Sequence, residues 1–327
     1  MEGKYHLIFP FANANLRKYW EDRPYPNFDE ETVLWTLRQM TGIATGLSQI
    51  HNFQVTIPLT ANRVQDDATL KVVEKEELFG RHGDIKPENI LWFKNFTGVE
   101  DKNGILKIAD FGLGRFHGRD SKSHVNPDNV ISSPTYEPPE CRLRRPVSRE
   151  YDVWSLGCVY LEFITLLLKG FAEIEAFGDC RGRLSSTGIN DDYFYTIGEN
   201  ATVREGVITW VEDLHSHPKC SALIHDLLDL IMDRLLLVDS KERYKANHLS
   251  SRLHEYLDKA QGDKQYLLKP VPRPPRVPQG NAAPPSSSSA RNKPRTTSGR
   301  RVSFVEEEVT EETPAKKLAK VFSFGPP

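Results

Sequence analysis

Cysteines, net charge and long apolar runs are all scarce in this sequence of 327 residues. Its four cysteines form no C-x-x-C pair and no histidine-flanked cluster, which argues against a disulfide framework or a zinc site and favours the cytoplasm or nucleus. Lysine plus arginine (43) nearly balances aspartate plus glutamate (45), so charge indicates no binding to nucleic acid or to an anionic membrane. The longest apolar run, residues 156–168, contains Glu162 and is too short to span a bilayer. We expect neither a membrane protein nor a secreted one.

The composition does provide for one substantial core, because 38% of the residues are apolar and 10% are aromatic. It changes near Gln261, and from Lys269 to Arg301 the chain is rich in proline and basic residues and lacks acidic ones. Such a segment buries too little apolar surface to offset its loss of conformational entropy. We predict a folded domain over residues 1–260 and a disordered Pro/Ser/Arg-rich tail over residues 261–327.

Within the domain the apolar periodicity is mostly helical. Three segments have the spacing or uniform apolarity of helices, with the middle one apolar nearly all round and therefore buried: 34–50, 151–168 and 223–237. Strand signals are confined to residues 6–11, 90–93 and 105–109. Asn103-Gly104 between the last two is typical of a hairpin turn. The sequence therefore predicts an α+β domain, mainly helical, with a short β-hairpin in its middle.

The residues that carry chemistry flank this hairpin. The sequence HGDIKPEN occupies residues 82–89, before the hairpin, and DFG occupies residues 110–112, after it. Phosphoryl transfer from a nucleotide needs magnesium on the phosphates, a carboxylate that positions the attacking hydroxyl, and positive charge beside the γ-phosphate. The two segments supply an aspartate, a lysine and two further oxygen ligands for a metal.

The two segments resemble the signature set of the protein-kinase family. Residues 133–140, SPTYEPPE, resemble the end of a kinase activation segment, with Pro-Pro-Glu where Ala-Pro-Glu usually stands. Residues 152–157, DVWSLG, are similar to the start of the central helix of the large lobe. Arg243 lies where the family places the arginine that pairs with this glutamate, here Glu140. The resemblance covers roughly residues 5–258 and implies a protein-kinase-like C-terminal lobe.

The resemblance implies a serine/threonine kinase that uses ATP and Mg²⁺ and acts on a protein substrate. On this interpretation Asp84 accepts the proton of the substrate hydroxyl and Lys86 steadies the γ-phosphate. Ser133 is implied to help seat the acceptor. Asn89 and Asp110 are the implied magnesium ligands.

The adenine site is implied as well. The strand and hinge from Phe9 to Ala12 would meet adenine, and Leu91 would form its floor. For Phe9, ordinary packing in a strand remains an open alternative. Lysine two positions after Asp84 is the serine/threonine form of the loop.

Three departures from the family pattern qualify this interpretation. Gly83 stands where most kinases have an arginine that grips a phosphorylated activation segment, so we expect activity that needs no such phosphorylation. Residues 52–80 are an insertion relative to the family pattern. We expect them to form a surface loop without a catalytic role, with a docking loop as the alternative. The Gly-rich loop, strand lysine and helix glutamate that precede the hinge in kinases are absent, which indicates a truncated N-lobe. A catalytically inactive kinase-like scaffold or binding module therefore remains the second hypothesis.

One short motif lies in the tail. Arg301, Val302 and Phe304 resemble the docking motif read by protein phosphatase type 1, in which the valine and phenylalanine fill two apolar pockets. Ser303 lies between them in a basic context suited to phosphorylation. We hypothesise that a phosphate there would switch the docking off.

Overall fold

The computed structural model describes residues 10–52, 78–98, 101–110, 115–118, 134–184 and 190–273. The chain divides into two units, Met1–Arg273 and Pro274–Pro327, and all of the second unit lies outside the described residues. The boundary predicted at residue 260 is therefore wrong, because the first unit continues to Arg273. A short helix after residue 260 packs onto the domain through the buried Tyr266 and Leu267.

Helices dominate the described part of the chain, as the sequence predicted. The α-helices are α1 (Leu16–Glu21), α2 (Glu30–His51), α3 (Pro139–Arg142), α4 (Glu150–Lys169), α5 (Ala172–Arg181), α6 (Glu205–His215), α7 (Ala222–Leu230), α8 (Ala246–Gly262) and α9 (Lys264–Leu268). Turns of other helix types lie at Pro87–Asn89, Pro134–Tyr136 and Ile231–Leu235. The strands are β1 (Ala14–Asn15), β2 (Leu78–Arg81), β3 (Ile90–Phe93), β4 (Ile105–Ile108), β5 (Arg115–Gly118), β6 (Arg183–Leu184), β7 (Asn190–Asp191), β8 (Tyr195–Ile197) and β9 (Ala201–Val203).

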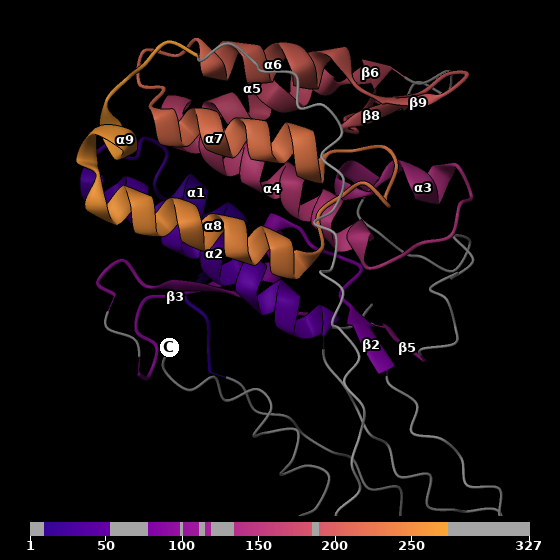
Figure 1. Ribbon diagram of the computed structural model, residues 1–327, viewed down its shortest axis with the longest axis horizontal. Helices are drawn as coiled ribbons and strands as arrows, with labels where there is room; N and C mark the ends of the chain where they lie inside the picture. Colours follow the sequence, from indigo (N-terminus) through magenta and orange to yellow (C-terminus); the bar gives the residue numbers. More distant parts are fainter. Residues whose placement is uncertain are drawn as a thin grey trace, which may run out of the picture. The chain divides into compact units, whose positions relative to one another are not determined.

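Helix α4 forms the centre of the core, and Figure 1 shows it among the other helices. Every residue from Tyr151 to Leu168 is buried, which confirms the helix expected there. The whole helix has 20 residues and is apolar enough to cross a membrane by length and composition. The apolar run at residues 156–168, which is too short by itself for a membrane span, covers only part of it. Because the 18-residue apolar window of the helix is entirely buried inside the fold, its apolarity is that of a core helix.

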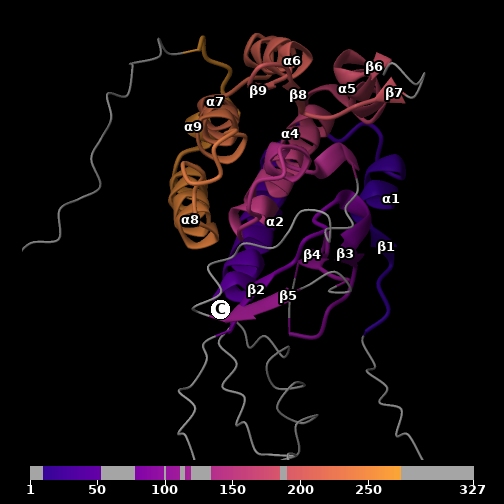
Figure 2. The same cartoon turned by 90° about the vertical axis from the view of Figure 1, so that its right-hand side faces the viewer.

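Helix α2 confirms the predicted apolar stripe and separates two parts of the fold. Figure 2 shows α8 on one side of α2 and the strands β3 and β4 on the other. Asp29 caps the helix by accepting a hydrogen bond from the Thr32 N–H at 2.9 Å. The two faces of α2 therefore join the helical core to the strands that carry the site.

The predicted hairpin is confirmed, since β3 and β4 pair antiparallel from Ile90 opposite Ile108 to Phe93 opposite Ile105. Gly104 turns the chain with φ of 75°, and a Cβ there would lie 2.3 Å from the Phe93 carbonyl oxygen, so only glycine fits. The Gly104 carbonyl accepts a hydrogen bond from Trp35 Nε1 at 2.7 Å. The hairpin is thereby fixed to α2.

The strand expected at residues 6–11 is not found where the structure describes it. Residues 1–9 lie outside the described part, while Pro10 and Phe11 are not in a strand and the Phe11 side chain is 96% exposed. The strand that joins the hairpin is β1, in the order β1-β3-β4. The pairing of β2 with β5 was not predicted, and β2 includes the last residues of the expected insertion.

A buried ion pair joins two distant segments of the lobe. Arg243 donates to both carboxylate oxygens of Glu140 at 2.7 Å, which confirms the pairing inferred from sequence. Both side chains are buried, so the two planar groups satisfy each other where water does not reach.

Replacing Arg243 with alanine is expected to lower the free energy of unfolding by about 3–5 kcal/mol, because it leaves the Glu140 carboxylate buried without a counter-charge. Denaturant unfolding measures the loss. Arg252→Ala is the matched control, since its pair with Glu255 is exposed and should contribute less than about 1 kcal/mol. Equal losses in the two variants would contradict the assignment.

Candidate active site

The loop at residues 82–84 is held by one buried carboxylate. Asp152, in the first turn of α4, accepts hydrogen bonds from the backbone N–H groups of His82 at 2.9 Å and Gly83 at 2.7 Å. His51 Nε2, at the end of α2, lies 2.7 Å from the same carboxylate. The loop is therefore attached to α4 directly and to α2 through the contact between Asp152 and His51.

The electrostatics of Asp152 favour its charged form. Complete burial alone would raise the pKa of this carboxyl, but the hydrogen bond and charge of His51 and the Gly83 N–H outweigh burial, so the pKa lies below its usual range. Asp152 thus acts as a permanent anion toward the loop at neutral pH.

Backbone geometry lets the loop turn toward the hairpin. Gly83 has φ of 84°, a left-handed conformation that glycine adopts without strain. His82 Nε2 donates to the Ala109 carbonyl oxygen at 2.9 Å. This contact joins the loop to the end of β4, directly before Asp110.

The polar side chains expected to do the chemistry meet in this loop. Asp84 Oδ2 lies 2.8 Å from both Lys86 Nζ and Asn89 Nδ2. Asn89 Nδ2 also donates to the Asp84 carbonyl oxygen at 2.9 Å. A one-turn helix at Pro87–Asn89 creates the spacing, since the Asn89 N–H donates to the Lys86 carbonyl at 3.0 Å. The carboxylate is oriented by a cation on one side and an amide on the other.

Asp110 reaches the same edge from the other strand of the hairpin. The Ala109 N–H donates to the Asn89 carbonyl oxygen at 2.9 Å, so the residue after Ala109 lies beside Asn89. Asp110 itself has φ of 63°, which turns the chain sharply away from β4. The backbone next to Asp110 therefore lies beside Asn89, whose side chain contacts Asp84, while the metal-binding roles of Asn89 and Asp110 stay predictions.

These residues fit a magnesium ion. Both hydrogen bonds that the Asn89 side chain donates to Asp84 use Nδ2, so Oδ1 is the atom that it can offer to a cation. Asp110, which follows the backbone hydrogen bond from Ala109 to Asn89, is the second oxygen ligand that the family resemblance implies. Hard oxygen ligands of this kind are those that Mg²⁺ prefers.

The adenine contacts are placed only in part. Leu91 is half-buried in β3 opposite Asn15, and Ala12 lies in the segment leading into β1. Their contact with a nucleotide stays a prediction. The remaining residues singled out from sequence lie outside the described residues: Phe9, Phe111, Gly112, Ser133, Arg301, Val302, Ser303 and Phe304.

Sequence reasoning missed the anchor of the loop. Asp152 was assigned only to the start of a helix, and His51, one residue after the helix expected over residues 34–50, was given no role. The available signal was a charged residue in the first turn of a helix that is otherwise apolar, since a buried carboxylate requires nearby donors.

The expectation that no cysteine lies in a histidine cluster is also wrong. His215 and His225 lie on either side of Cys220, and all three are buried together. The spacing was readable, but it matches none of the short zinc-binding patterns.

The fold and the site define a kinase large lobe, and comparison with known families agrees. The protein kinase domain family matches residues 77–252, just over half of the chain. The chain belongs to the protein kinase family, of the eukaryotic serine/threonine type.

Individual relatives match shorter parts. Cyclin-dependent kinase 4 of Mus musculus is 29% identical over 177 residues, which cover 54% of this chain and 45% of that protein. Serine/threonine-protein kinase nekl-2 of Caenorhabditis elegans is 38% identical over 85 residues, covering 26% of this chain and 21% of the relative. GLH-binding kinase 1 of the same species is 34% identical over 125 residues, covering 37% and 29%. The chain thus spans less than half the length of these curated relatives.

Asp152→Asn is expected to destabilise the fold by about 1.5–3 kcal/mol, because an amide has one acceptor oxygen for three donors. Denaturant unfolding and faster amide exchange at His82 and Gly83 measure the effect. The depressed pKa means that the carboxylate stabilises the fold above the usual carboxyl range and loses this effect as pH falls through its folded pKa. The difference in free energy of unfolding between the parent chain and Asp152→Asn should therefore shrink in acid.

The matched control is Asp258→Asn on the exposed face of α8, which should change stability by less than about 0.5 kcal/mol. Unchanged exchange at Gly83 in the Asp152 variant would show that the carboxylate does not hold the loop.

Proposed function

We propose that this chain is a protein serine/threonine kinase that transfers the γ-phosphoryl group of ATP to a serine or threonine hydroxyl of a protein substrate. The observation that supports it most directly is the convergence of Asp84, Lys86 and Asn89, with Asp110 beside them. A solvated polar loop would not need its carboxylate oriented by two donors, nor its backbone attached to a core helix.

Each side chain has a part in this reaction. Asp84 accepts the proton of the substrate hydroxyl, and its position is maintained by Lys86 and Asn89. Lys86 also places positive charge where the γ-phosphoryl group is transferred. Asn89 and Asp110 would hold Mg²⁺. When bound, ATP would supply the phosphoryl group, and magnesium would neutralise the negative charge that develops during the transfer.

The remaining roles follow from the family resemblance. Ser133 would help to seat the acceptor, while Phe9, Ala12 and Leu91 would contact adenine. The identity of the protein substrate depends on surfaces outside these motifs.

Three further proposals rest on the sequence alone. Arg301, Val302 and Phe304 would dock protein phosphatase type 1. The scarcity of cysteine favours a cytoplasmic or nuclear location. The tail from residue 274 onward would remain without a packed core.

Transfer of labelled phosphate from ATP to a generic basic protein should require magnesium. Asp84→Asn and Asp110→Asn should each reduce the rate by about 10²–10⁴-fold, because one removes the base and the other a metal ligand. A filter-binding assay of incorporated label measures this, with Asp258→Asn as the control that retains activity.

Equal label incorporation in all variants would refute the proposal. If the chain binds ATP with magnesium, seen as a nucleotide-dependent rise in melting temperature, yet transfers no label, the scaffold hypothesis is favoured instead.

Activity should be unchanged after treatment with a protein phosphatase. Gly83 provides no guanidinium to hold a phosphorylated activation segment, and Arg81, just before the loop, is 3% exposed and packs over the Tyr151 ring. Kinase assays before and after treatment, with the phosphatase removed, test this. A clear loss of activity would show that another cation takes over the role.

A further inference from the structure

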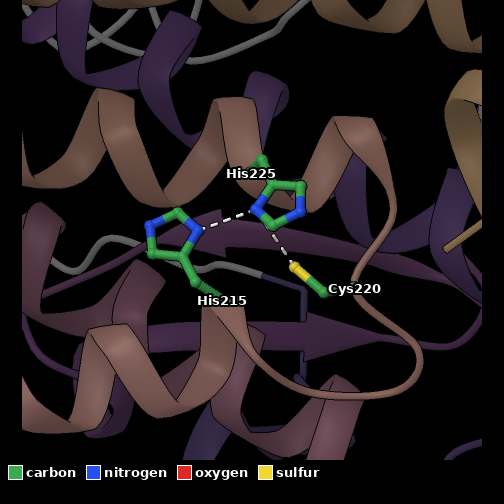
Figure 3. A group of neighbouring side chains, drawn as sticks. All are labelled: His215, Cys220 and His225. Carbon is green, nitrogen blue, oxygen red and sulfur yellow. Dashed lines mark hydrogen bonds between the residues drawn. The ribbon is translucent and has the colours of Figure 1, made fainter. Parts of the chain in front are cut away.

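Three side chains outside the candidate active site form a compact buried cluster. Figure 3 shows His215 at the end of α6, Cys220 in the α6–α7 loop and His225 in α7, all directed toward one another. One nitrogen or sulfur atom of each lies within 4.8 Å of the others. Their exposed fractions are 5%, 1% and 1%. Phosphoryl transfer makes no use of these residues.

The chain holds this cluster in place from two directions. Ser221 begins α7 as its N-cap and sits opposite Pro270 in an antiparallel bridge. The Val271 N–H donates to the Cys220 carbonyl oxygen at 3.1 Å. The last described segment, Pro270–Arg273, therefore closes over the loop that carries the cysteine.

Hydrogen bonding determines the protonation of His225. Its Nε2 lies 2.9 Å from the Val271 carbonyl oxygen, which can only accept, so Nε2 carries the proton. In the neutral ring Nδ1 then carries no proton, and its lone pair can accept a hydrogen bond or bind a cation. The His225 Nδ1 atom lies 2.8 Å from His215 Nδ1 and 3.5 Å from Cys220 Sγ.

No neutral form of His215 suits its surroundings. Its Nε2 is buried, makes no hydrogen bond among the described residues and faces Asp229 Oδ1 at 3.5 Å. With the proton on Nδ1, the bare Nε2 faces a carboxylate. With the proton on Nε2, two Nδ1 lone pairs face each other at 2.8 Å. Either way a buried acceptor opposes another acceptor, which is costly.

We propose that His215 Nδ1, His225 Nδ1 and Cys220 Sγ bind a zinc ion. A cation between the two Nδ1 atoms converts their opposed lone pairs into ligands. It also places the His215 proton on Nε2, toward Asp229. Both histidines then direct Nε2–H at an oxygen, Val271 O for one and Asp229 Oδ1 for the other, as zinc-bound histidines usually do.

Two of the three donor separations are close to those of a tetrahedral zinc site, and the third is within 4.8 Å. Bonds of about 2.3 Å to sulfur and about 2.05 Å to nitrogen place the sulfur and nitrogen about 3.6 Å apart. The separation of Cys220 Sγ from His225 Nδ1 is 3.5 Å. The two Nδ1 atoms, now 2.8 Å apart, need to separate only to about 3.3 Å.

The charges around the cluster favour a divalent cation. Arg273 donates to Glu212 at 2.7 Å and to Asp229 at 2.8 Å, so one guanidinium faces two carboxylates. This leaves a surplus negative charge, and a metal-bound Cys220 thiolate adds a second. A divalent ion balances both.

One side of the cluster borders the protein surface. A surface pocket of about 540 Å³ is lined by the loop and the closing segment, and His215 and Cys220 contribute to its wall. A metal can enter there, and water can occupy the fourth position. The ion would add a further link between α6, α7 and Pro270–Arg273, beside the hydrogen bonds and Arg273 ion pairs already present there.

Metal binding by the full chain tests the proposal directly. The chain, freed of metal by a chelator, should take up one equivalent of zinc, measured by elemental analysis and by competition with a coloured zinc indicator. With cobalt(II) as the probe it should show a thiolate-to-cobalt charge-transfer band. Zinc should also raise the melting temperature, because it binds only the folded chain.

Cys220→Ser should abolish the cobalt charge-transfer band. It should also weaken zinc binding by more than about 100-fold, the upper end of the loss expected when only a hydrogen-bond partner of a ligand is removed. Asp229→Asn should keep the band and weaken binding by about 10–100-fold. Cys180→Ser, at an exposed cysteine, is the matched control and should bind zinc like the parent chain.

Absence of the cobalt band from the parent chain would overturn the proposal, whether or not the Cys220 variant folds. So would zinc uptake that Cys180→Ser abolishes, which would indicate an adventitious surface site. In either case the two histidines would share a proton instead of a metal. The kinase assay is not involved, so failure here leaves the proposed function unaffected.

Discussion

The geometry of the candidate active site depends on one buried carboxylate. Asp152 is fully buried and stays charged because two loop N–H groups and His51 donate to it. A buried charge without such donors would be too costly to retain, so the loop cannot leave without destabilising α4. This mutual dependence places Asp84 against the core of the domain. The loop that carries Asp84 is therefore held in place through its backbone, in addition to the packing of buried loop residues such as His82 and Ile85.

The hairpin extends this order to the two residues proposed to bind magnesium. Pairing of β3 with β4 brings the segment before Asp110 against Asn89, although the two residues are well separated along the chain. Helix α2 holds the hairpin through Trp35. The histidine and cysteine cluster belongs to another part of the same unit, since Figure 1 shows α6 and α7 above α4 and β3 below it. The chain thus combines a candidate site for phosphoryl transfer with a separate proposed zinc site.

Local patterns predicted local structure well. The strand over residues 90–93, the hairpin turn at Gly104 and the helix spanning residues 151–168 were all readable, because periodicity and turn chemistry act over a few residues. The pairing of Arg243 with Glu140 came from family resemblance and is confirmed. The pairing of β2 with β5 and the docking of α9 were not predicted, because each depends on partners distant in sequence. Most of the strand expected at residues 6–11 lies outside the described residues, and Pro10 and Phe11 are not in a strand.

The amino-acid sequence by itself determined the chemistry of this protein: which acids, amides and cations are available and in what order around a hairpin. Tertiary structure decided which of them meet. Asp152 anchors the loop because the fold places α4 against it, and Cys220 lies beside two histidines because α6 and α7 pack together near Pro270–Arg273. The physical reason is that hydrogen bonds and metal ligation act over about 2–3 Å, whereas sequence separation places no limit on which residues a folded core brings together.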